Sequence, residues 1–459
     1  MRLLFCCELY EPSRGGVQEV MRQIAERMAA AGHDVTVATS FLPERRFEML
    51  NGVKIRQFRA SGNRSRGMGG EVDQYRDFVV EFGADAILIK AAQQWTFDAL
   101  WPVLDRIAAR KVFIPCGFSG LFEPAYAQYF ADLPQILRKL DHLIFYAEKY
   151  RDIDFARAHG VTRLSVIPNG ASELEFDRPP DIEVRTRLGI DDDEFIFLTV
   201  GSPIVGKGHG YVAEAFARLQ TDGRPATLIL NGSWPRPGES PPPASPARPV
   251  GGIPVRVARR IGREIRRALA LGRRSVALLR REKLAAFRAR VRNRIERLDT
   301  EQQITQWIEQ ANAQPGKRVL CTNLPRSDLV ATFMAADLFV FASTIEYSPL
   351  VLFEAAAAGV PFLSVPVGNA EEIARWTGGG IICPAVQDGR GYTRVDPSVL
   401  AGEMRRCMHD PSLLRRLGAV AKDRWRERFS WRVIAPQYEA VLGDRLSAPE
   451  NARECQTTA

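Results

Sequence analysis

Metal-ligating and disulfide-forming residues are sparse in this sequence of 459 residues. Its five histidines never fall at metal-ligand spacing, and no CxxC or Cys/His cluster occurs. An odd, dispersed set of cysteines is typical of reduced thiols in a cytosolic compartment. We therefore expect no metal site, no cofactor and no disulfide framework. The seven cysteines are Cys6, Cys7, Cys116, Cys321, Cys383, Cys407 and Cys455.

Long apolar runs and familiar catalytic motifs are missing as well. No uninterrupted apolar stretch approaches the ~20 residues of a membrane-spanning helix, and the opening MRLLFCCELY lacks a signal-peptide cleavage site. The motifs G-x-S-x-G, H-E-x-x-H and the Walker lysine motif do not occur. With 46% apolar and 25% charged residues, we expect a soluble, cytoplasmic protein. Peripheral attachment to the inner face of the plasma membrane stays open.

What the sequence does contain is a strand–helix pattern. Leu3 to Cys7 is a short apolar run of the kind found in buried parallel strands, and Gly15 and Gly16 follow it. Residues 17–28 carry apolar side chains at three- to four-residue spacing, which predicts an amphipathic helix. A second strand from Val35 to Ala38 completes a βαβ unit, and such units predict a parallel sheet.

The same pattern begins again in the second half of the chain. Phe195 to Val200 is predicted to be a strand, GSPIVGKGHG a glycine-rich loop, and Tyr211 to Leu219 a helix. Pro, Asn, Gly and charged residues between 168 and 195 separate the two series. We therefore predict an α/β fold of two Rossmann-like, doubly wound domains that face a cleft.

The basic excess is concentrated in an interruption of the second half, residues 236–300. Residues 236–254 are rich in Pro, Gly and Ser and predict a disordered linker. From Arg248 to Arg297, sixteen arginines and one lysine face three glutamates, a net of +14; the overall charge of +9 therefore leaves −5 for the rest of the chain. Apolar residues three or four apart then predict one or two basic amphipathic helices.

Three interpretations of residues 255–298 stay open. The segment could form a solvated helical hairpin on its own domain, or lie on an anionic membrane surface through its arginines and its apolar face. Nucleic-acid binding is disfavoured, because Phe287 is the only aromatic residue in the segment and base stacking needs more.

Two glycine-rich loops each join a predicted strand to a predicted helix. Gly15 and Gly16 would let an anion approach the bare amides at a helix N-terminus. Gly201 opens the second loop, in which Lys207 supplies a cation where a phosphate would meet it. In both loops the alternative is structural, namely glycines that serve a tight turn and a solvated lysine.

The stretch TIEYSPLVLFEAAAAGVP, residues 344–361, predicts a helix with defined ends. Ser348 is expected to be its N-cap and Pro349 its first residue, while Gly359 follows its end. The free amides of Leu350 and Val351 then lie in its first turn.

Two glutamates of this stretch are eight positions apart. Glu346 is predicted to lie in the loop before the helix and Glu354 inside the helix. Together with the bare amides between them, they could grip a polyhydroxylated ligand. The alternative, an ordinary exposed acid at Glu354, is disfavoured by its apolar neighbours, and a buried carboxylate needs a partner.

Together these features resemble the retaining glycosyltransferases of the GT-B fold in family 4. The E-x7-E block is the most specific motif. The resemblance implies an N-terminal acceptor-side domain at 1–175, a nucleotide-sugar-binding domain at 176–430, and a helix within 431–459 that crosses back to the first domain before a disordered tail. The motifs are P-x-x-GGV near the start, GHDV at 32–35, VIPNG at 166–170, VG-x5-KG at 200–208, E-x7-E followed by A-x-A-x-G-x-P, and FSW at 429–431.

The resemblance also implies a role for individual residues. Glu354 would hold the nucleotide ribose hydroxyls, Glu346 would contact the donor sugar, and Lys207 would neutralise the leaving diphosphate. The amides after Tyr347 would hold the sugar, and Gly16 would approach the phosphate from the opposite domain. Glu346 and Lys207 are the expected catalytic residues, without a metal ion. The expected donor-binding set is Gly15, Gly16, Gly201, Lys207, Glu346, Ser348, Pro349, Leu350, Val351 and Glu354.

Three positions depart from the family pattern. Ser202 stands where many relatives have an arginine beside the glycine, so one phosphate cation is missing. Cys116 stands where relatives often have a histidine near the acceptor, and Ser172 replaces the usual acid after the NG turn. The long basic insertion is also outside the common pattern.

The resulting hypothesis is a retaining, metal-independent, hexosyltransferase-type enzyme. It would move a sugar from a nucleoside-diphosphate donor to a glycan or lipid-linked acceptor in cell-surface polysaccharide or glycolipid synthesis. One alternative is a nucleotide-sugar epimerase or hydrolase on the same framework. Another is a weakly active scaffold that binds a membrane or a partner through 255–298.

Overall fold

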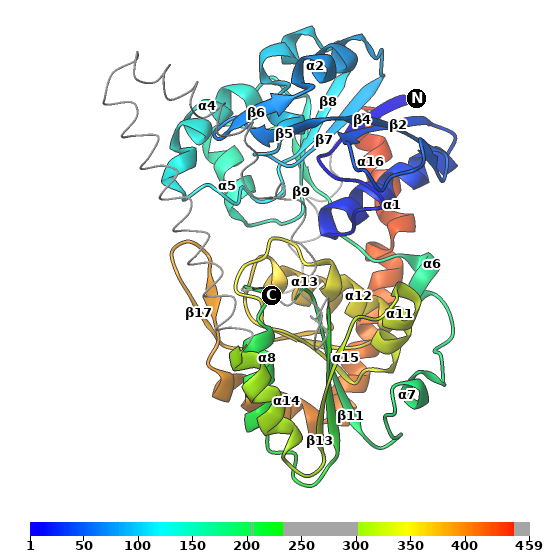
Figure 1. The fold of residues 1–459 in the computed structure, drawn as a ribbon, viewed down its shortest axis with the longest axis vertical. Helices are drawn as coiled ribbons and strands as arrows, with labels where there is room; N and C mark the ends of the chain where they lie inside the picture. The colour runs from blue at the N-terminus through cyan, green and yellow to red at the C-terminus, as the bar shows by residue number, and fades with distance from the viewer. Residues whose placement is uncertain (203, 205, 233–301, 445–459) are drawn as a thin grey trace, which may run out of the picture.

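The structure is a computed structural model that describes residues 1–202, 204, 206–232 and 302–444. The predicted linker and basic helices at 236–300 and the predicted terminal tail lie outside the described residues. Figure 1 shows the N-terminal domain above and the second domain below, each built around its own sheet.

The first sheet has eight strands in the order β10-β9-β8-β7-β1-β2-β4-β3. All neighbours pair in parallel except β3 and β4. A separate hairpin, β5 with β6, pairs antiparallel. The strands are β1 (Arg2–Cys6), β2 (Asp34–Ser40), β3 (Met49–Leu50), β4 (Val53–Phe58), β5 (Ala60–Asn63), β6 (Gly67–Gly70), β7 (Ala86–Lys90), β8 (Arg110–Ile114), β9 (His142–Phe145) and β10 (Leu164–Val166).

Helices cover the first sheet between its strands. They are α1 (Gly16–Ala30), α2 (Val72–Glu81), α3 (Trp95–Asp98), the 3₁₀ helices η1 (Trp101–Arg106) and η2 (Pro124–Tyr126), α4 (Ala127–Leu137) and α5 (Arg151–Ala158). The predicted amphipathic helix is α1, which buries Val20, Ile24 and Met28 against the sheet.

The second sheet has six parallel strands in the order β13-β12-β11-β14-β15-β16. A short antiparallel hairpin of β17 and β18 stands apart from it. The strands are β11 (Phe195–Val200), β12 (Ala226–Asn231), β13 (Lys317–Thr322), β14 (Leu338–Phe341), β15 (Phe362–Ser364), β16 (Gly380–Ile382), β17 (Val386–Gln387) and β18 (Thr393–Arg394).

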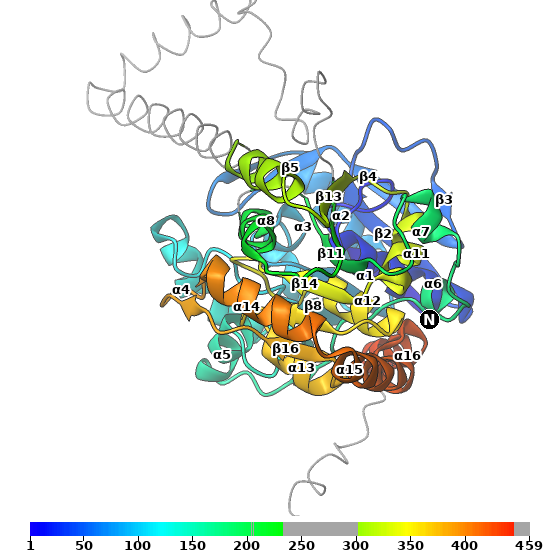
Figure 2. The same cartoon turned by 90° about the horizontal axis from the view of Figure 1, so that it is seen from below.

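The second domain is likewise flanked by helices, and Figure 2 shows α8 and α14 side by side. The helices are α6 (Glu173–Phe176), α7 (Val184–Arg187), α8 (His209–Arg218), α11 (Arg326–Ala335), α12 (Leu350–Ala358), α13 (Ala370–Thr377), α14 (Pro397–Met408), α15 (Pro411–Arg424), the π-helix η3 (Trp425–Phe429) and α16 (Trp431–Leu442). Residues 302–312 are helical as well.

The predicted α/β class with two Rossmann-like domains is confirmed. Every strand named in the sequence occurs within two residues of its expected bounds, and Phe195–Val200 has the expected ends. The second predicted helix begins at His209 instead of Tyr211. Strand β4 was not predicted, although Val53 and Ile55 are buried and alternate with exposed Lys54 and Arg56, a pattern that favours a half-buried strand.

The order of the strands defines one switch point in each sheet. Numbered along the chain from 1 to 6, the strands β11 to β16 follow the doubly wound order 3-2-1-4-5-6, which reverses between β11 and β14. In the first sheet the order reverses between β1 and β7. Ligands of such sheets bind at the carboxyl ends of the strands beside the switch point. The loops after β1, β11 and β14 carry Gly16, Lys207 and Glu346 to these points.

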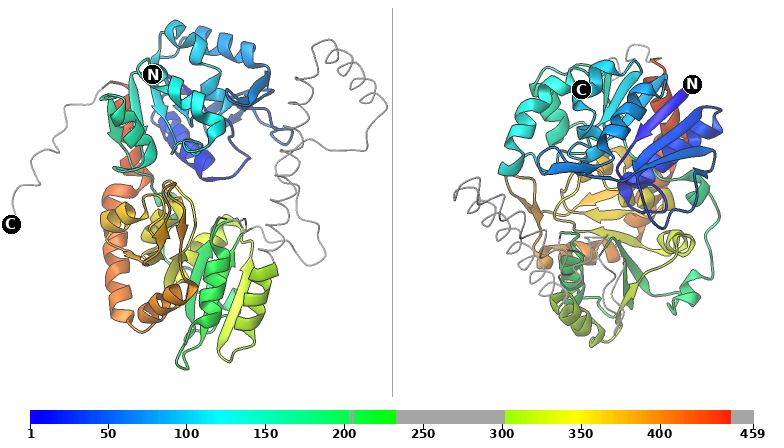
Figure 3. Two further views of the ribbon diagram at one scale, coloured as in Figure 1. Left: turned by 90° about the vertical axis from the view of Figure 1, so that its left-hand side faces the viewer. Right: turned by 45° about the horizontal axis from the view of Figure 1, so that its top comes forward.

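The chain passes between the domains twice, and the two crossings lie against each other. The amide of Ala171 donates to the carbonyl of Phe429 (3.1 Å), and Ala171 pairs with Ser430 as a β-bridge. A Cβ at Gly170 would lie 2.2 Å from that same Phe429 oxygen, so only glycine permits this approach. Figure 3 shows α16 running from the second domain up along the first. There Trp431 is buried in the core around β1.

Candidate functional site

Helix α12 begins at the carboxyl end of β14 and places its first turn between the domains. Pro349 is the N-cap, with the extended backbone angles φ −70° and ψ 117°, and Leu350 is the first helical residue. The prediction of Ser348 as N-cap is therefore wrong by one residue, because the extended proline delays the helix. The Ser348 hydroxyl is buried without a hydrogen-bond partner in the described part of the chain.

The first turn of α12 therefore offers unused donors. The amides of Leu350 and Val351 donate to no acceptor among the described residues, as expected for the first amides of a helix. Glycine ends the helix at Gly359, which has the left-handed φ of 75° that favours this residue. These amides carry the positive end of the helix dipole.

Glu346 and Lys207 form an ion pair beside this helix start. The Lys207 ammonium lies 2.5 Å from Oε1 of Glu346, which also accepts from the Ser343 hydroxyl (3.1 Å). The lysine side chain is 35% exposed and the glutamate side chain 16% exposed. The two predicted catalytic residues are thus adjacent, with the cation open to an incoming ligand.

The loop that carries Lys207 is fixed to the β14 loop. Gly206 accepts hydrogen bonds at its carbonyl from the Ser343 hydroxyl and from the Thr344 amide (both 2.8 Å). Gly208 has a φ of +77°, and a Cβ there would lie 2.0 Å from the Ala342 carbonyl oxygen. The imidazole of His209 contacts the Gly201 carbonyl (3.0 Å). Burial lowers the pKa of His209 to about 4, so it is neutral near pH 7.

Glu354 is the second carboxylate of the site and has a partner that the sequence did not reveal. It is 8% exposed. Arg326, the first residue of α11, donates from Nη2 to its Oε1 (2.6 Å). The same guanidinium forms a fork with Glu175 of α6, at 2.8 and 2.7 Å. Burial raises the pKa of Glu354, and the nearby guanidinium opposes that rise.

The N-terminal domain closes over the β14 loop through tyrosines. The hydroxyl of Tyr347 accepts from the Tyr146 amide (2.9 Å), and the Tyr150 hydroxyl donates to the Glu346 carbonyl (2.7 Å). Tyr347 also hydrogen-bonds Asp152, whose pKa burial raises to about 6. The side-chain amide of Asn169 donates to the Ser348 carbonyl (3.0 Å). These contacts fix the position of the Glu346 loop against the other domain.

The first glycine-rich loop meets α12 from the opposite domain. Gly15 is the N-cap of α1 and makes no side-chain cap. A Cβ on Gly16 would lie 3.6 Å from the Leu350 side chain, so this glycine is in contact range of the α12 start. Gly16 is thus the glycine that meets the α12 start, while Gly15 precedes it and Gly201 lies at the beginning of the Lys207 loop, next to His209.

The three departures from the family pattern occupy different surroundings. Ser202 is exposed on the Lys207 loop. Cys116 has a left-handed φ of 65°, and burial raises the pKa of its thiol. Nearby Lys90 is fully buried, and burial lowers its pKa to about 8. Ser172 is buried at the start of α6.

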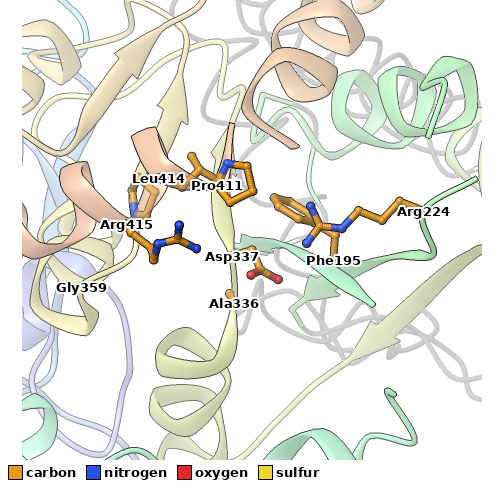
Figure 4. Close-up of a pocket in the computed structure, with 9 residues that line it drawn as sticks. Phe195, Arg224, Ala336, Asp337, Gly359, Pro411, Leu414 and Arg415 are labelled. Carbon is orange, nitrogen blue, oxygen red and sulfur yellow. The ribbon is translucent and has the colours of Figure 1, made fainter. Parts of the chain in front are cut away.

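The pocket in Figure 4 lies at the other edge of the second sheet. Figure 4 shows Asp337 between the side chains of Arg224 and Arg415. Phe195 opens β11 and Asp337 directly precedes β14, so this pocket is at the amino ends of the strands. Ligands of doubly wound sheets bind at the carboxyl ends, which places the candidate site elsewhere.

The described residues offer neither a grouped set of metal ligands nor a helix suited to span a membrane. Within residues 1–202, 204, 206–232 and 302–444, no three His, Cys, Asp or Glu side chains are grouped so that they could hold a metal ion. In the same part of the chain, no helix combines the length and the apolar character that crossing a membrane requires. The expectations of metal independence and of the cellular location stay predictions.

Comparisons with known proteins agree with this architecture. The family model described as glycosyl transferases group 1 matches residues 298–424, and the glycosyl transferase 4-like domain model matches residues 15–170. An Anabaena protein, HepE, solved with UDP-glucose, has a TM-score of 0.61 at 16% identity over 97% of this chain and 100% of that chain. Sucrose-phosphate synthase from Thermosynechococcus elongatus gives 0.65 at 19% identity over 97% and 99%.

Two curated relatives match a smaller part of the chain. N-acetyl-alpha-D-glucosaminyl L-malate synthase of Bacillus anthracis is 31% identical over 131 residues, 28% of this chain and 32% of that protein. D-inositol 3-phosphate glycosyltransferase of Streptomyces bingchenggensis is 34% identical over 121 residues, 26% and 24% of the two chains. The matches thus span about a third or less of these relatives. With the two family models and the GT-B architecture, the chain belongs to the glycosyl transferases of group 1.

Proposed function

We propose that this chain is a retaining glycosyltransferase that transfers a sugar from a nucleoside-diphosphate donor to a hydroxyl group of a glycan or lipid-linked acceptor. The observation that carries the proposal is the pairing of Glu346 with Lys207 at the open N-terminus of α12. A cation and bare helix amides together suit a diphosphate. The family membership and the UDP complexes of an Anabaena protein with the same fold support a nucleotide-sugar donor.

In the proposed reaction, Lys207 and the amides of Leu350 and Val351 stabilise the charge that develops on the leaving diphosphate. The bond between the sugar C1 and the diphosphate oxygen breaks, and the acceptor oxygen bonds C1 on the same face. The acceptor proton passes to the leaving phosphate oxygen, so no protein base is required. Glu346 contacts the donor sugar, and Glu354 accepts from the ribose hydroxyls. Charge compensation in this scheme needs no metal ion.

The acceptor is proposed from the cell-surface glycan and lipid classes. Solved proteins of the same fold include one involved in lipopolysaccharide biosynthesis, WaaG, at a TM-score of 0.57. The curated relatives instead carry L-malate or inositol phosphate in their names. A panel that offers both glycan or lipid-linked acceptors and small polyols therefore tests this part of the proposal.

Product analysis tests the activity. We expect purified protein to release nucleoside diphosphate and to form an α-linked product from an α-linked donor only when an acceptor is present. Release of free sugar without acceptor, or conversion of the donor to its epimer, would replace transfer by the hydrolase or epimerase alternative. Inversion of the anomeric configuration would overturn the retaining mechanism.

The scaffold alternative is tested by deleting residues 255–298. Loss of binding to anionic vesicles with unchanged transfer would make that segment a localising element of an active enzyme. No transfer by the full chain or by the deletion variant, across the acceptor panel, would favour the scaffold.

A further inference from the structure

Arg326 is a charged residue beside Glu354 that is held by several contacts of its own. Its Nε and Nη2 atoms form a two-pronged contact with the Glu175 carboxylate, at 2.8 and 2.7 Å. Its guanidinium carbon lies 5.8 Å from the ring centre of Phe176, which is fully buried. Both neighbours belong to α6, so these contacts hold the guanidinium plane independently of its contact with Glu354.

From this fixed position, Arg326 reaches one oxygen of Glu354. Nη2 donates to Oε1 over 2.6 Å. The other oxygen, Oε2, makes no hydrogen bond within the described part of the chain, and the Glu354 side chain keeps 11% of its surface exposed. One carboxylate oxygen is thus anchored and the other remains an available acceptor.

The surroundings of Glu354 make this cation necessary. After Arg326, the charged groups with the largest effect on its carboxylate are two acids, Glu175 of α6 and Glu19 of α1, both of which disfavour its ionised form. Arg326 favours the ionised form, and it also acts on Glu19 across the domain boundary. A buried carboxylate among acids without a cation takes up a proton and ceases to be a pure acceptor.

We propose that Arg326 is a positioning residue for the donor nucleotide: by fixing Oε1 of Glu354 it holds this carboxylate in one orientation and presents Oε2 to the ribose hydroxyls. The inference rests on the proposed function, because it assumes a nucleotide at Glu354. It assigns to this arginine a part in selecting ribonucleotides over 2′-deoxyribonucleotides. A protonated or rotated Glu354 would lose that selectivity while leaving the diphosphate contacts at Lys207 unchanged.

The test compares UDP with 2′-deoxy-UDP, and GDP with 2′-deoxy-GDP, by calorimetry on the full-length protein. We expect the wild-type chain to prefer the ribonucleotide at least tenfold. Arg326→Met should weaken ribonucleotide binding about tenfold and reduce the preference to threefold or less. The donor KM should rise by a similar factor, while kcat changes less than threefold.

Arg426→Met is the matched control. Arg426 also pairs with a carboxylate next to α6, Asp177 (3.1 Å), but has no contact with Glu354 among the described residues. This variant should retain both the affinity and the preference. An Arg326→Met protein that keeps the wild-type preference overturns the inference, whatever its stability.

Arg326→Lys provides a second variant if the methionine variant does not fold. Lysine retains the charge but cannot form the two-pronged contact, so we expect a folded protein whose ribose preference falls at least threefold. An unchanged preference in this variant also overturns the inference. Wild-type protein that binds none of UDP, GDP, ADP, CDP and dTDP overturns the proposed function itself, which separates the two failures.

Discussion

The two glutamates of the E-x7-E motif each pair with a cation, yet the two pairs are built differently. Lys207 stands on a loop and contacts Glu346 through a single ion pair among the described residues. Exposure does not distinguish the two cations, because the Lys207 side chain is 35% exposed and that of Arg326 is 36% exposed. Arg326 stands at a helix start and is held by Glu175 whether or not it contacts Glu354. One cation can exchange its protein partner for a ligand, and the other cannot move without losing its own anchor.

This difference separates two tasks within one motif. A flexible point charge suits a diphosphate whose charge changes during the reaction. A fixed guanidinium suits the orientation of a carboxylate whose partner, a pair of hydroxyl groups, does not change. We therefore expect substitutions on the Glu346 side to act on the rate of transfer and substitutions on the Glu354 side to act on nucleotide binding.

The largest effect is expected for Glu346→Ala. Removing the carboxylate beside the reacting centre should lower kcat about a thousandfold, since contacts at developing charge are worth roughly 3–4 kcal/mol. The rate is measured by release of nucleoside diphosphate in the presence of acceptor. Glu371→Ala is the control, because Glu371 is an exposed acid of α13. Full transfer activity in Glu346→Ala would contradict the catalytic and sugar-binding roles assigned to Glu346.

Lys207→Met should lower kcat about a hundredfold, because one cation is lost while the helix amides remain. Lys207→Arg should recover part of this loss. Lys149→Met, at an exposed lysine elsewhere along the domain boundary, should leave transfer unchanged. A larger effect of Lys207→Met on donor KM than on kcat would contradict the assignment of the rate of transfer to the Glu346–Lys207 pair and of nucleotide binding to the Glu354–Arg326 pair.

Gly170→Ala tests the crossing between the domains at residues 170–172, which leads directly into α6. Through Glu175 and Arg326, α6 is connected to Glu354. The new Cβ would meet the Phe429 carbonyl oxygen at 2.2 Å, so we expect a loss of about 2 kcal/mol or more in the free energy of unfolding. Gly402→Ala in α14 has open space around it and should be neutral or slightly stabilising. Equal denaturant midpoints for the two variants would show that residues 170–172 and 429–431 can move apart without loss of stability.

The smallest effect concerns how stability changes at low pH through His209, which lies next to the Lys207 loop. His209 is buried, and its pKa lies near 4 instead of the usual 6.5. The unfolded chain therefore binds a proton that the folded chain does not, so His209 costs stability as pH falls from about 6.5 towards 4 and costs none above 6.5. His209→Gln should flatten this part of the stability curve by about 1 kcal/mol at pH 5.5. Parallel curves for variant and wild type would contradict it.

Much of the fold was predictable because its signals are local. The longer strands of the two sheets, such as β1, β7, β11 and β14, are mostly apolar runs of four to six residues, and α12 is bounded by proline and glycine. The one-residue error at Ser348 arose where two preferences compete. Proline is common as the first helical residue, but here Pro349 keeps an extended ψ of 117° and takes the cap position itself.

The partners within the site were not predictable in the same way. Arg326 lies 28 residues from Glu354 and 151 from Glu175, and nothing in RSDL distinguishes a ligand-site arginine from a solvated one. Only its place after β13, at the carboxyl edge of a parallel sheet, was a usable signal. The contact of Tyr347 with Tyr146 spans 201 residues and depends on how the two domains meet.

The double crossing has a consequence for how the molecule would come apart. Residues 170–172 and 429–431 lie side by side, and α16 is part of the N-terminal core. A cut at 170–172 therefore leaves the domains held together by the non-covalent packing of α16, and a cut at 429–431 leaves them joined through 170–172. A protease nick there would give two bands in a denaturing gel and a single particle in native buffer. Only cleavage at both crossings would let the halves diffuse away from one another.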